Sequence, residues 1–334
     1  MTGPLVSVII PAYNTGRYLP ETLESVFAQS YDNFEVIVID DGSVDDTRDQ
    51  VRAFGSRLTL LERAHEGIGP ARNAGLARAT GEFVAFLDSD DLWVPDTLRT
   101  QVDVARRHPE SGLVACDGIQ FDDDRVLRAH LLDSQLRSRL ERASEGVFSD
   151  FMYDSFCAAS LIACPAQALI TRRAIDVVGD ACATPNGVQD YDYYLRIARS
   201  FPVTFHSASL ARWRYRSDSM SGVAPTRNFR WSVLALAALE RQQTLGTPGD
   251  REMLRTAITR RARKALAGAV DFRLSGSTPE PEELAKIYQL LPTDPVIVGI
   301  RTAFALPAPF DLLALKGGRA ARRAVGKLAS VVQR

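Results

Sequence analysis

Short apolar runs alternate with amphipathic segments through the first two thirds of the chain. Residues 5–10, 34–39 and 83–87 are short, mainly apolar runs, and the first two are rich in β-branched side chains, which is typical of strands buried on both faces of a sheet. In residues 19–27, apolar side chains recur at i, i+4, i+7 and i+8, as on one face of a helix. This alternation predicts a mainly parallel sheet with helices on both faces.

Weaker patterns extend the same order. Further strands are predicted at residues 58–61, 113–116, 168–171 and 203–205, and further helices at 43–54, 67–79, 95–107 and 190–200. Ser43 and Asp46 resemble a capping box that opens the helix at 43–54. The polar residues 122–149 predict a loop.

The character of the chain changes after residue 222. Only helix patterns remain, at residues 231–239, 254–266 and 282–291. Residues 1–222 contain 22 basic and 32 acidic residues, a net charge of −10, whereas residues 223–334 contain 18 and 9, a net charge of +9. We therefore predict an α/β domain at residues 1–222 and a basic helical C-terminal extension at residues 223–334.

Missing motifs exclude several classes of protein. The four cysteines form no CxxC pair and the four histidines no HExxH motif, so neither a disulfide framework nor these zinc sites are indicated. The GxGxxG fingerprint of nicotinamide dehydrogenases and the GxSxG elbow of serine hydrolases are also missing. The first apolar run is too short for a secretory signal, and no run approaches the roughly 20 residues that span a bilayer, so we expect a cytoplasmic protein.

Three aspartates, Asp88, Asp90 and Asp91, follow the strand predicted at 83–87. Carboxylates this close repel one another unless a cation offsets their charge. Mg²⁺ and Mn²⁺ suit such hard oxygen ligands, and Mg²⁺ completes its shell with substrate phosphates. The alternative is a solvated turn whose aspartates cap the next helix.

Other polar residues stand at the ends of predicted elements. Asp40 and Asp41 end the second strand, where an acid either accepts hydrogen bonds from a ribose or base or caps the next helix. Arg72 follows two glycines at a helix start, a position that suits an anion. Asp190 and Asp192 lie at another helix start, where each is either a general base or an acid favoured by the helix dipole.

Taken together, these segments resemble the family 2 glycosyltransferases of GT-A fold. The blocks, in the family's order and spacing, are SVIIPAYN, VIVIDDGSVDDT, GIGPARNAGLARATGEFVAFLDSDD and VPDTL, with ALITRRAIDVVG and VQDYDYYLRIARS further on. The resemblance covers about residues 4–221. It implies a Rossmann-like α/β/α domain that transfers a sugar, with inversion, from a nucleotide-sugar to a hydroxyl acceptor. A UDP-sugar is the favoured donor, and cell-surface glycan or polysaccharide synthesis the favoured setting.

The resemblance also assigns roles to single residues. Asp88 and Asp90 match the outer positions of the family's DxD motif, which holds Mn²⁺ or Mg²⁺. Asp190 matches the general base, although Gln189 stands where the family has Glu. The matches to nucleotide-binding positions are Pro11, Ala12, Tyr13, Asp40, Asp41 and Arg72. The matches near the acceptor or a phosphate are Asp91, Trp93 and Arg216.

Three other functions fit parts of this pattern. A processive membrane synthase would carry a QxxRW motif, but the chain's two RW pairs lack the glutamine. A non-catalytic nucleotide-sugar-binding protein would not need Asp88, Asp90 and Asp190, all of which are present. A nucleotidyltransferase on a similar sheet would release pyrophosphate. The expected partners are a nucleotide-sugar and a glycan or lipid-linked acceptor, and no nucleic acid.

The end of the chain is basic and amphipathic. Residues 312–334 contain six basic residues and no acid, and on a helix Ala320, Ala324, Leu328 and Val331 would form an apolar stripe. Such a segment suits an anionic membrane surface and would hold the protein peripherally at the inner face of the membrane. Packing against the acidic first domain and self-association are the alternatives.

Overall fold

The computed structural model describes residues 3–122, 125–181 and 189–216, and further on residues 235, 238–239, 252–263, 266, 284–285 and 289. The chain divides into two compact units, Met1–Arg216 and Ser217–Arg334. In the second unit, residues 252–263 are helical and overlap the helix predicted at 254–266. Most of the helices predicted at 231–239 and 282–291, and all of the basic tail at 312–334, lie outside the described residues.

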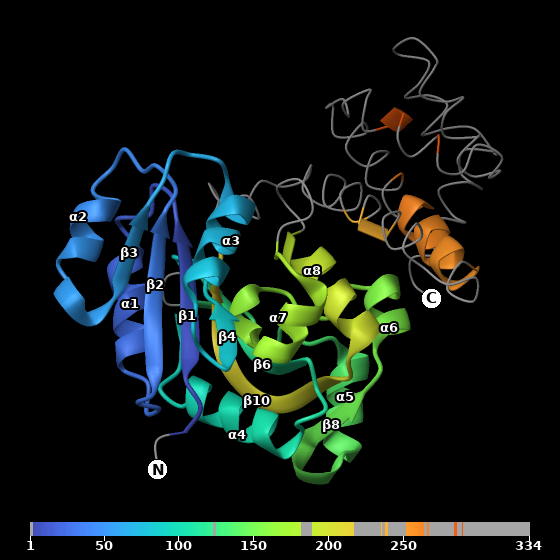
Figure 1. The fold of residues 1–334 in the computed structure, drawn as a ribbon. Helices are drawn as coiled ribbons and strands as arrows, with labels where there is room; N and C mark the ends of the chain where they lie inside the picture. The colour runs from blue at the N-terminus through green and yellow to red at the C-terminus, as the bar shows by residue number, and fades with distance from the viewer. Residues whose placement is uncertain are drawn as a thin grey trace. The chain divides into compact units, whose positions relative to one another are not determined.

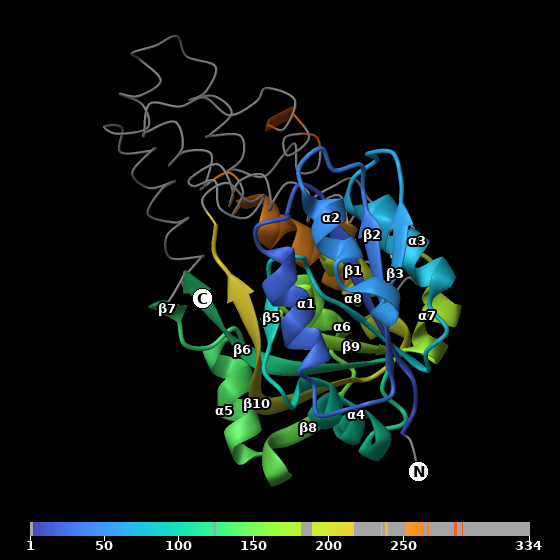
Figure 2. The ribbon, with the colours of Figure 1, turned by 90° about the vertical axis from the view of Figure 1, so that its left-hand side faces the viewer.

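One ten-stranded sheet forms the centre of the first unit (Figures 1 and 2). In sheet order its strands are β3 (Thr59–Glu62), β2 (Phe34–Asp40), β1 (Val6–Ala12), β4 (Phe83–Phe86), β9 (Ala168–Thr171), β6 (Leu113–Asp122), β10 (Val203–Arg214) and β5 (Leu92–Trp93). In addition, β7 (Arg125–Arg128) pairs with β6, and β8 (Val147–Asp150) pairs with β10. Strands β1, β2, β3, β4, β6 and β10 all point the same way, which confirms the mainly parallel sheet.

Helices cover both faces of this sheet. They are α1 (Leu19–Phe27), α2 (Thr47–Arg52), α3 (Ile68–Arg78), α4 (Thr97–Arg107), α5 (Ser134–Arg142), α6 (Tyr153–Ala158), α7 (Arg172–Val178) and α8 (Gln189–Ser200). Figure 2 shows α1 and α2 in front of β1 and β2, with α3 and α8 behind the sheet. The predicted helices at 19–27, 67–79, 95–107 and 190–200 are therefore confirmed, with ends shifted by at most two residues.

Strand β1 is buried on both faces, which explains why all but one of its residues, Ser7, are apolar. Val8 and Ile10 belong to the same apolar core as Leu19 of α1. Ile9 points the other way, toward α3, where a Cβ placed on Gly75 would lie 2.3 Å from Ile9 Cγ2. A glycine at residue 75 thus lets α3 approach the sheet closely.

The prediction that β1 ends before Pro11 is wrong, because the strand continues to Ala12. Pro11 is paired with Ile39 of β2. On its other side, β4 ends at Phe86, after which Leu87 donates a backbone hydrogen bond to Ile9. An N–H at residue 11 would point to the side of β1 on which β4 has already ended. The absence of this N–H in Pro11 therefore costs the sheet no backbone hydrogen bond.

The capping box predicted at Ser43 and Asp46 is also wrong. Helix α2 begins only at Thr47, and its N-cap residue Asp46 makes no capping hydrogen bond with its side chain. The Ser43 hydroxyl instead accepts a hydrogen bond from the backbone of Asn14, at 3.0 Å. Ser43 therefore ties the turn after β2 to the turn after β1.

The described residues between 122 and 149 form strands and a helix rather than a loop. They contain β7, α5 and the start of β8. Helix α5 is capped by Asp133, whose side chain accepts a hydrogen bond from the backbone of Leu136 at 2.8 Å. Its buried residues are Leu136 and Leu140, so one i, i+4 pair anchors an otherwise polar helix. That pair is too short a pattern to predict a helix from the sequence.

Candidate active site

A fixed carboxylate and a flat aromatic pair lie where β1 and β2 end. Asp41 is buried, and its two oxygens accept hydrogen bonds from the backbone of Glu66 at 3.0 Å and of Gly67 at 2.8 Å. His65 Nδ1 lies 2.8 Å from Asp41 Oδ2. The His65 ring also stacks on Tyr13, with the centroids 3.9 Å apart, and Tyr13 is 43% exposed. This arrangement offers an aromatic surface beside an acid that is held in place.

The buried side chain of Asp40 supports the loop that follows β2. It is buried, accepts a hydrogen bond from the backbone of Ser43 at 3.1 Å, and lies 3.5 Å from Arg48 Nε. Gly42, between Asp41 and Ser43, has a φ of +79°, which favours glycine. Pro11 and Ala12 are buried in β1. The structure thus brings the predicted nucleotide-binding residues of the first two strands to one edge of the sheet.

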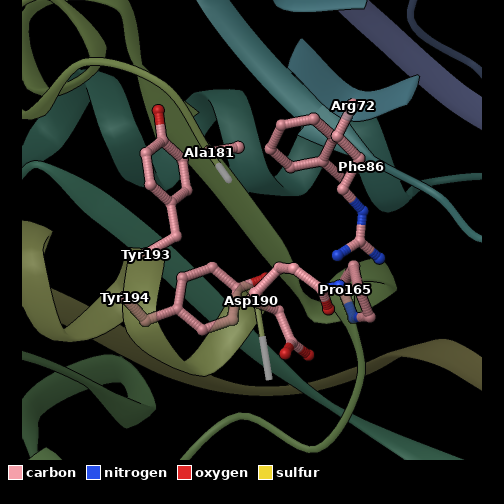
Figure 3. Close-up of a pocket in the computed structure, with 8 residues that line it drawn as sticks. Arg72, Phe86, Pro165, Ala181, Asp190, Tyr193 and Tyr194 are labelled. Carbon is pink, nitrogen blue, oxygen red and sulfur yellow. The ribbon is translucent and has the colours of Figure 1, made fainter. Parts of the chain in front are cut away.

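Arg72 bonds Asp88 and lines a pocket together with Asp190, which Figure 3 shows. Its Nη2 donates a hydrogen bond to Asp88 Oδ1 at 2.8 Å, and its guanidinium lies 5.6 Å from the centre of the Phe86 ring. Arg72 and Asp190 line one pocket, with an empty volume of about 200 Å³ that is partly open to solvent. The other lining residues are Phe86, Pro165, Ala181, Gln189, Tyr193 and Tyr194.

The charges in this pocket shift one another's proton affinities. Burial raises the pKa of Asp190, with a further contribution from Asp88, and the positive charge of Arg72 only partly opposes the shift. Burial alone would lower the pKa of Arg72, but the carboxylates of Asp88 and Asp190 outweigh it, so the net shift is upward. The pocket therefore holds a permanent cation beside an acid with increased affinity for a proton.

Arg214, at the end of β10, and Arg216, two residues later, bind the acids that follow β4. The backbone N–H of Arg214 donates to Asp91 Oδ1 and its Nε donates to the carbonyl of Asp90, both at 2.9 Å. Arg214 Nη2 also bonds Glu21 of α1, at 2.5 Å. Arg216 Nη1 lies 2.9 Å from Asp90 Oδ2. Sequence reasoning missed Arg214 and Glu21, whose pairing across 193 positions has no local pattern.

Excess negative charge remains in this cluster. Burial and the neighbouring Asp88 raise the pKa of Asp90, although Arg216 opposes the shift. Burial, Asp90 and Asp88 raise the pKa of Asp91 well above its usual range, and Asp91 Oδ2 is buried without a hydrogen-bond partner. Among the described residues no three His, Cys, Asp or Glu side chains gather as a metal site. Asp88 and Asp90 are each paired with an arginine, Arg72 and Arg216, and two carboxylates are the number that Mg²⁺ usually takes from a protein when phosphates complete its shell.

Trp93 lies apart from these charges. It is buried in β5, and its indole N–H donates to the carbonyl of Ala166 at 2.8 Å. This bond joins β5 to the segment before β9, so Trp93 stabilises the core. Its role near an acceptor stays a prediction.

Two solved structures are similar to this fold over nearly the whole chain. The Staphylococcus aureus protein TarS, residues 1–349, in complex with UDP-GlcNAc, is similar with a TM-score of 0.62 and 17% identity, over 98% of this chain and 91% of that one. The mannosyltransferase PcManGT of Pyrobaculum calidifontis, in complex with GDP-Man and Mn²⁺, gives a TM-score of 0.58 and 20% identity, over 98% and 86%. The fold is thus of the GT-A class, as the sequence predicts.

The sequence identifies the family. Residues 7–178 match the profile of Glycosyl transferase family 2. The chain belongs to this family of transferase enzymes. An uncharacterized glycosyltransferase of Rickettsia felis is 28% identical over 244 residues, which is 69% of this chain but only 37% of that protein. The Escherichia coli enzyme WfgD, a UDP-Glc:α-D-GlcNAc-diphosphoundecaprenol β-1,3-glucosyltransferase, is 43% identical over 104 residues, 30% of this chain and 41% of the enzyme. The chain thus spans well under half the length of these two relatives.

No helix among the described residues is both long and apolar enough to span a membrane.

Proposed function

We propose that the protein transfers a sugar, with inversion, from a nucleotide-sugar to a hydroxyl acceptor. The observation that carries this proposal is that Arg72, which bonds Asp88, lines one pocket together with Asp190. Such an arrangement supplies a base for the attacking hydroxyl and a cation for the leaving group on neighbouring side chains. Membership of the family supports the same reaction.

Asp190 would act as the general base. Its carboxylate takes the proton from the acceptor hydroxyl while that oxygen attacks the anomeric carbon. The nucleoside diphosphate leaves from the opposite face, so a single displacement inverts the configuration. The raised pKa of Asp190 suits this role, because a base closer to neutral pH removes a proton more effectively.

The charge that develops on the leaving diphosphate would be met by Arg72 and Arg216. Both guanidiniums are already held beside the carboxylates that follow β4. Asp88 and Asp90 would hold Mn²⁺ or Mg²⁺, which supplies Lewis-acid stabilisation of the diphosphate when bound. The structure of PcManGT with GDP-Man and Mn²⁺ supports this choice of metal.

A UDP-sugar is the proposed donor. The Tyr13–His65 pair offers a ring surface for a base, and Asp41 lies beside it. The named substrate of WfgD and the UDP-GlcNAc complex of TarS support uridine over guanosine. WfgD acts on a sugar linked to a lipid diphosphate, which supports a glycan or lipid-linked acceptor and a role in cell-surface polysaccharide synthesis.

The test is the release of UDP from a panel of UDP-sugars by the purified protein with Mn²⁺, with and without candidate acceptors. We expect Asp190→Asn to lower turnover by about 10²–10⁴-fold while the affinity for the donor is nearly unchanged. Release of pyrophosphate from UTP and a sugar 1-phosphate, with no release of UDP from a UDP-sugar, would indicate a nucleotidyltransferase, and binding without turnover a non-catalytic protein.

Asp192→Asn is the matched control. Asp192 is on the same helix and loses the same charge, but its carboxylate bonds Arg196 Nε at 3.1 Å. Arg196 in turn donates to the carbonyls of Val178 and Asp180, both at 2.7 Å. We therefore expect this variant to lose stability and to keep its turnover when folded. Equal losses of turnover in both variants would contradict the assignment of Asp190 as the base.

A further inference from the structure

The ring of His65 makes the two contacts that a uracil base would make beside Asp41. It stacks on Tyr13, with the ring centroids 3.9 Å apart and the planes 18° from parallel. Its Nδ1 lies 2.8 Å from Asp41 Oδ2, and since a carboxylate only accepts hydrogen bonds, Nδ1 carries the proton. The uracil of a uridine nucleotide is likewise a flat ring with one ring N–H. His65 thus presents the same shape and the same kind of donor to Tyr13 and Asp41 as the base of a UDP-sugar.

His65 and a base cannot occupy this place together. Rings 3.9 Å apart are in contact, so no third ring fits between Tyr13 and His65. Tyr13 is 43% exposed, so its outer face also offers a ring surface. A base on that face would have the Tyr13 ring between itself and the layer of the His65 ring, whose edge Asp41 contacts. The place that His65 occupies is therefore the one where a base reaches both Tyr13 and Asp41.

The ring of His65 is attached loosely, whereas the backbone that follows it is fixed. The side chain is 52% exposed, and among the described residues its ring and hydrogen-bonding contacts go only to Tyr13 and Asp41. The next two backbone N–H groups, of Glu66 and Gly67, donate to the buried Asp41 carboxylate. The ring can therefore rotate into solvent while Asp41 and the loop keep their positions.

We propose that His65 takes the place of the base in the free protein and that a uridine nucleotide displaces its ring on binding. This inference rests on the proposed function, from which it takes the UDP-sugar donor, and it makes His65 a determinant of donor affinity. A ligand that binds only one of two conformations has its affinity reduced to the fraction of molecules in that conformation. The base also replaces contacts that the protein already makes, so the diphosphate supplies most of the net affinity. After transfer, the returning ring restores the contacts of Tyr13 and Asp41, which favours the release of UDP.

The test is calorimetry of the full-length wild type and His65→Ala with UDP and Mn²⁺. The side chain is half exposed, so the variant leaves no cavity in the core. We expect UDP to bind the variant about three- to tenfold tighter, as it would if the ring is rotated out in about a tenth to a third of wild-type molecules. Pyrophosphate with Mn²⁺, which carries no base, should bind both proteins equally. Equal or weaker binding of UDP by the variant, or an equal gain with pyrophosphate, would overturn the proposal.

His130→Ala is the matched control. His130 is 48% exposed, and its Nδ1 lies 2.7 Å from Oδ2 of the buried Asp117. Asp117 belongs to β6, which β4 and β9 separate from β1 in the sheet. The control thus removes the same kind of pair away from the proposed base site and should leave the affinity for UDP unchanged. If both variants bound UDP more tightly by the same factor, the gain would not come from the base site and the proposal would fail.

Nuclear magnetic resonance of the histidine rings follows the displacement itself. The signals of His65 are assigned by their absence from the spectrum of His65→Ala. In the free protein the ring current of Tyr13 shifts them upfield, and UDP should move them toward the position of an exposed histidine while the signals of His130 stay in place. Signals of His65 that keep their position, or that move further upfield because a base stacks on this ring, would overturn the proposal.

These measurements do not depend on sugar transfer. If UDP displaces the His65 ring and binds His65→Ala more tightly, but the wild type neither hydrolyses nor transfers any sugar, the exchange of His65 for the base stands and the proposed function fails. If sugar is transferred while His65→Ala binds UDP no more tightly than the wild type, the proposed function stands and the exchange is wrong.

Discussion

His206 makes the stability of the first unit depend on pH. It lies in β10, only 2% exposed, with Nε2 3.4 Å from Gln101 Oε1. Burial, with a smaller effect of Arg107, lowers its pKa from 6.5 to about 4. The folded protein therefore keeps His206 neutral at pH values where the unfolded chain binds a proton, so the free energy of unfolding falls as the pH falls.

The size of the effect follows from the shift. The contribution of neutral His206 to the free energy of unfolding is fully present well above pH 6.5. A shift of its pKa from 6.5 to about 4 means that about 3 kcal/mol of this free energy is lost once the pH is below 4. Between pH 7 and pH 4.5 the loss should be about 2.5 kcal/mol. Other acids also titrate in this range, so the contribution of His206 is measured as the difference between the wild type and variants that cannot titrate at this position.

The assay is urea unfolding, followed by circular dichroism at pH 7 and pH 4.5. His206→Gln and His206→Phe should differ from each other at pH 7, because one keeps a polar contact and the other does not. Between pH 7 and pH 4.5, the free energy of unfolding of both variants should fall by less than that of the wild type. The difference should be about 2.5 kcal/mol for each variant. If all three proteins show parallel changes within about 0.5 kcal/mol, His206 does not titrate abnormally and the reasoning is refuted.

Three further predictions concern the metal, the core and the tail. Asp90→Asn should lower turnover by roughly a thousandfold, and EDTA should abolish wild-type turnover until Mn²⁺ or Mg²⁺ is restored; a variant fully active in chelator would contradict this. Gly75→Ala should destabilise the fold by about 1–3 kcal/mol in urea, because the contact with Ile9 at 2.3 Å outweighs a gain of about 1 kcal/mol in helix propensity; higher stability would contradict it. The full chain, but not one ending at Phe310, should sediment with anionic vesicles at low salt only; equal sedimentation of both would exclude the tail.

The parts of the site that depend on local sequence could be predicted. Asp40 ends β2 and Asp41 follows it, and Asp88 and Asp90 come within four residues of the end of β4, so parallel topology alone brings them to one edge of the sheet. The position of Asp190 at the start of α8 follows from helix periodicity. Its nearness to Arg72 does not, because it depends on how α8 packs against the sheet.

Contacts between distant segments could not be predicted. The stacking of His65 on Tyr13 depends on the loop that Asp41 holds through its backbone hydrogen bonds. The continuation of β1 through Pro11 depends on where β4 ends, which no pattern around residue 11 records. The prediction of a loop at 122–149 failed for a similar reason, since Leu136 and Leu140 gain their burial from the rest of the fold.

The bonds from Arg214 and Arg216 to the acids after β4 also constrain the order of folding. They join residues 123 to 126 positions apart, so the turn that carries Asp90 and Asp91 stays without these partners until the end of β10 has been synthesised. Pairings of such long range form slowly, because a large loop must close before any contact is gained. The parallel strands β1 to β4 are complete on the growing chain well before this, which makes the acidic turn one of the last parts of the domain to reach its final conformation.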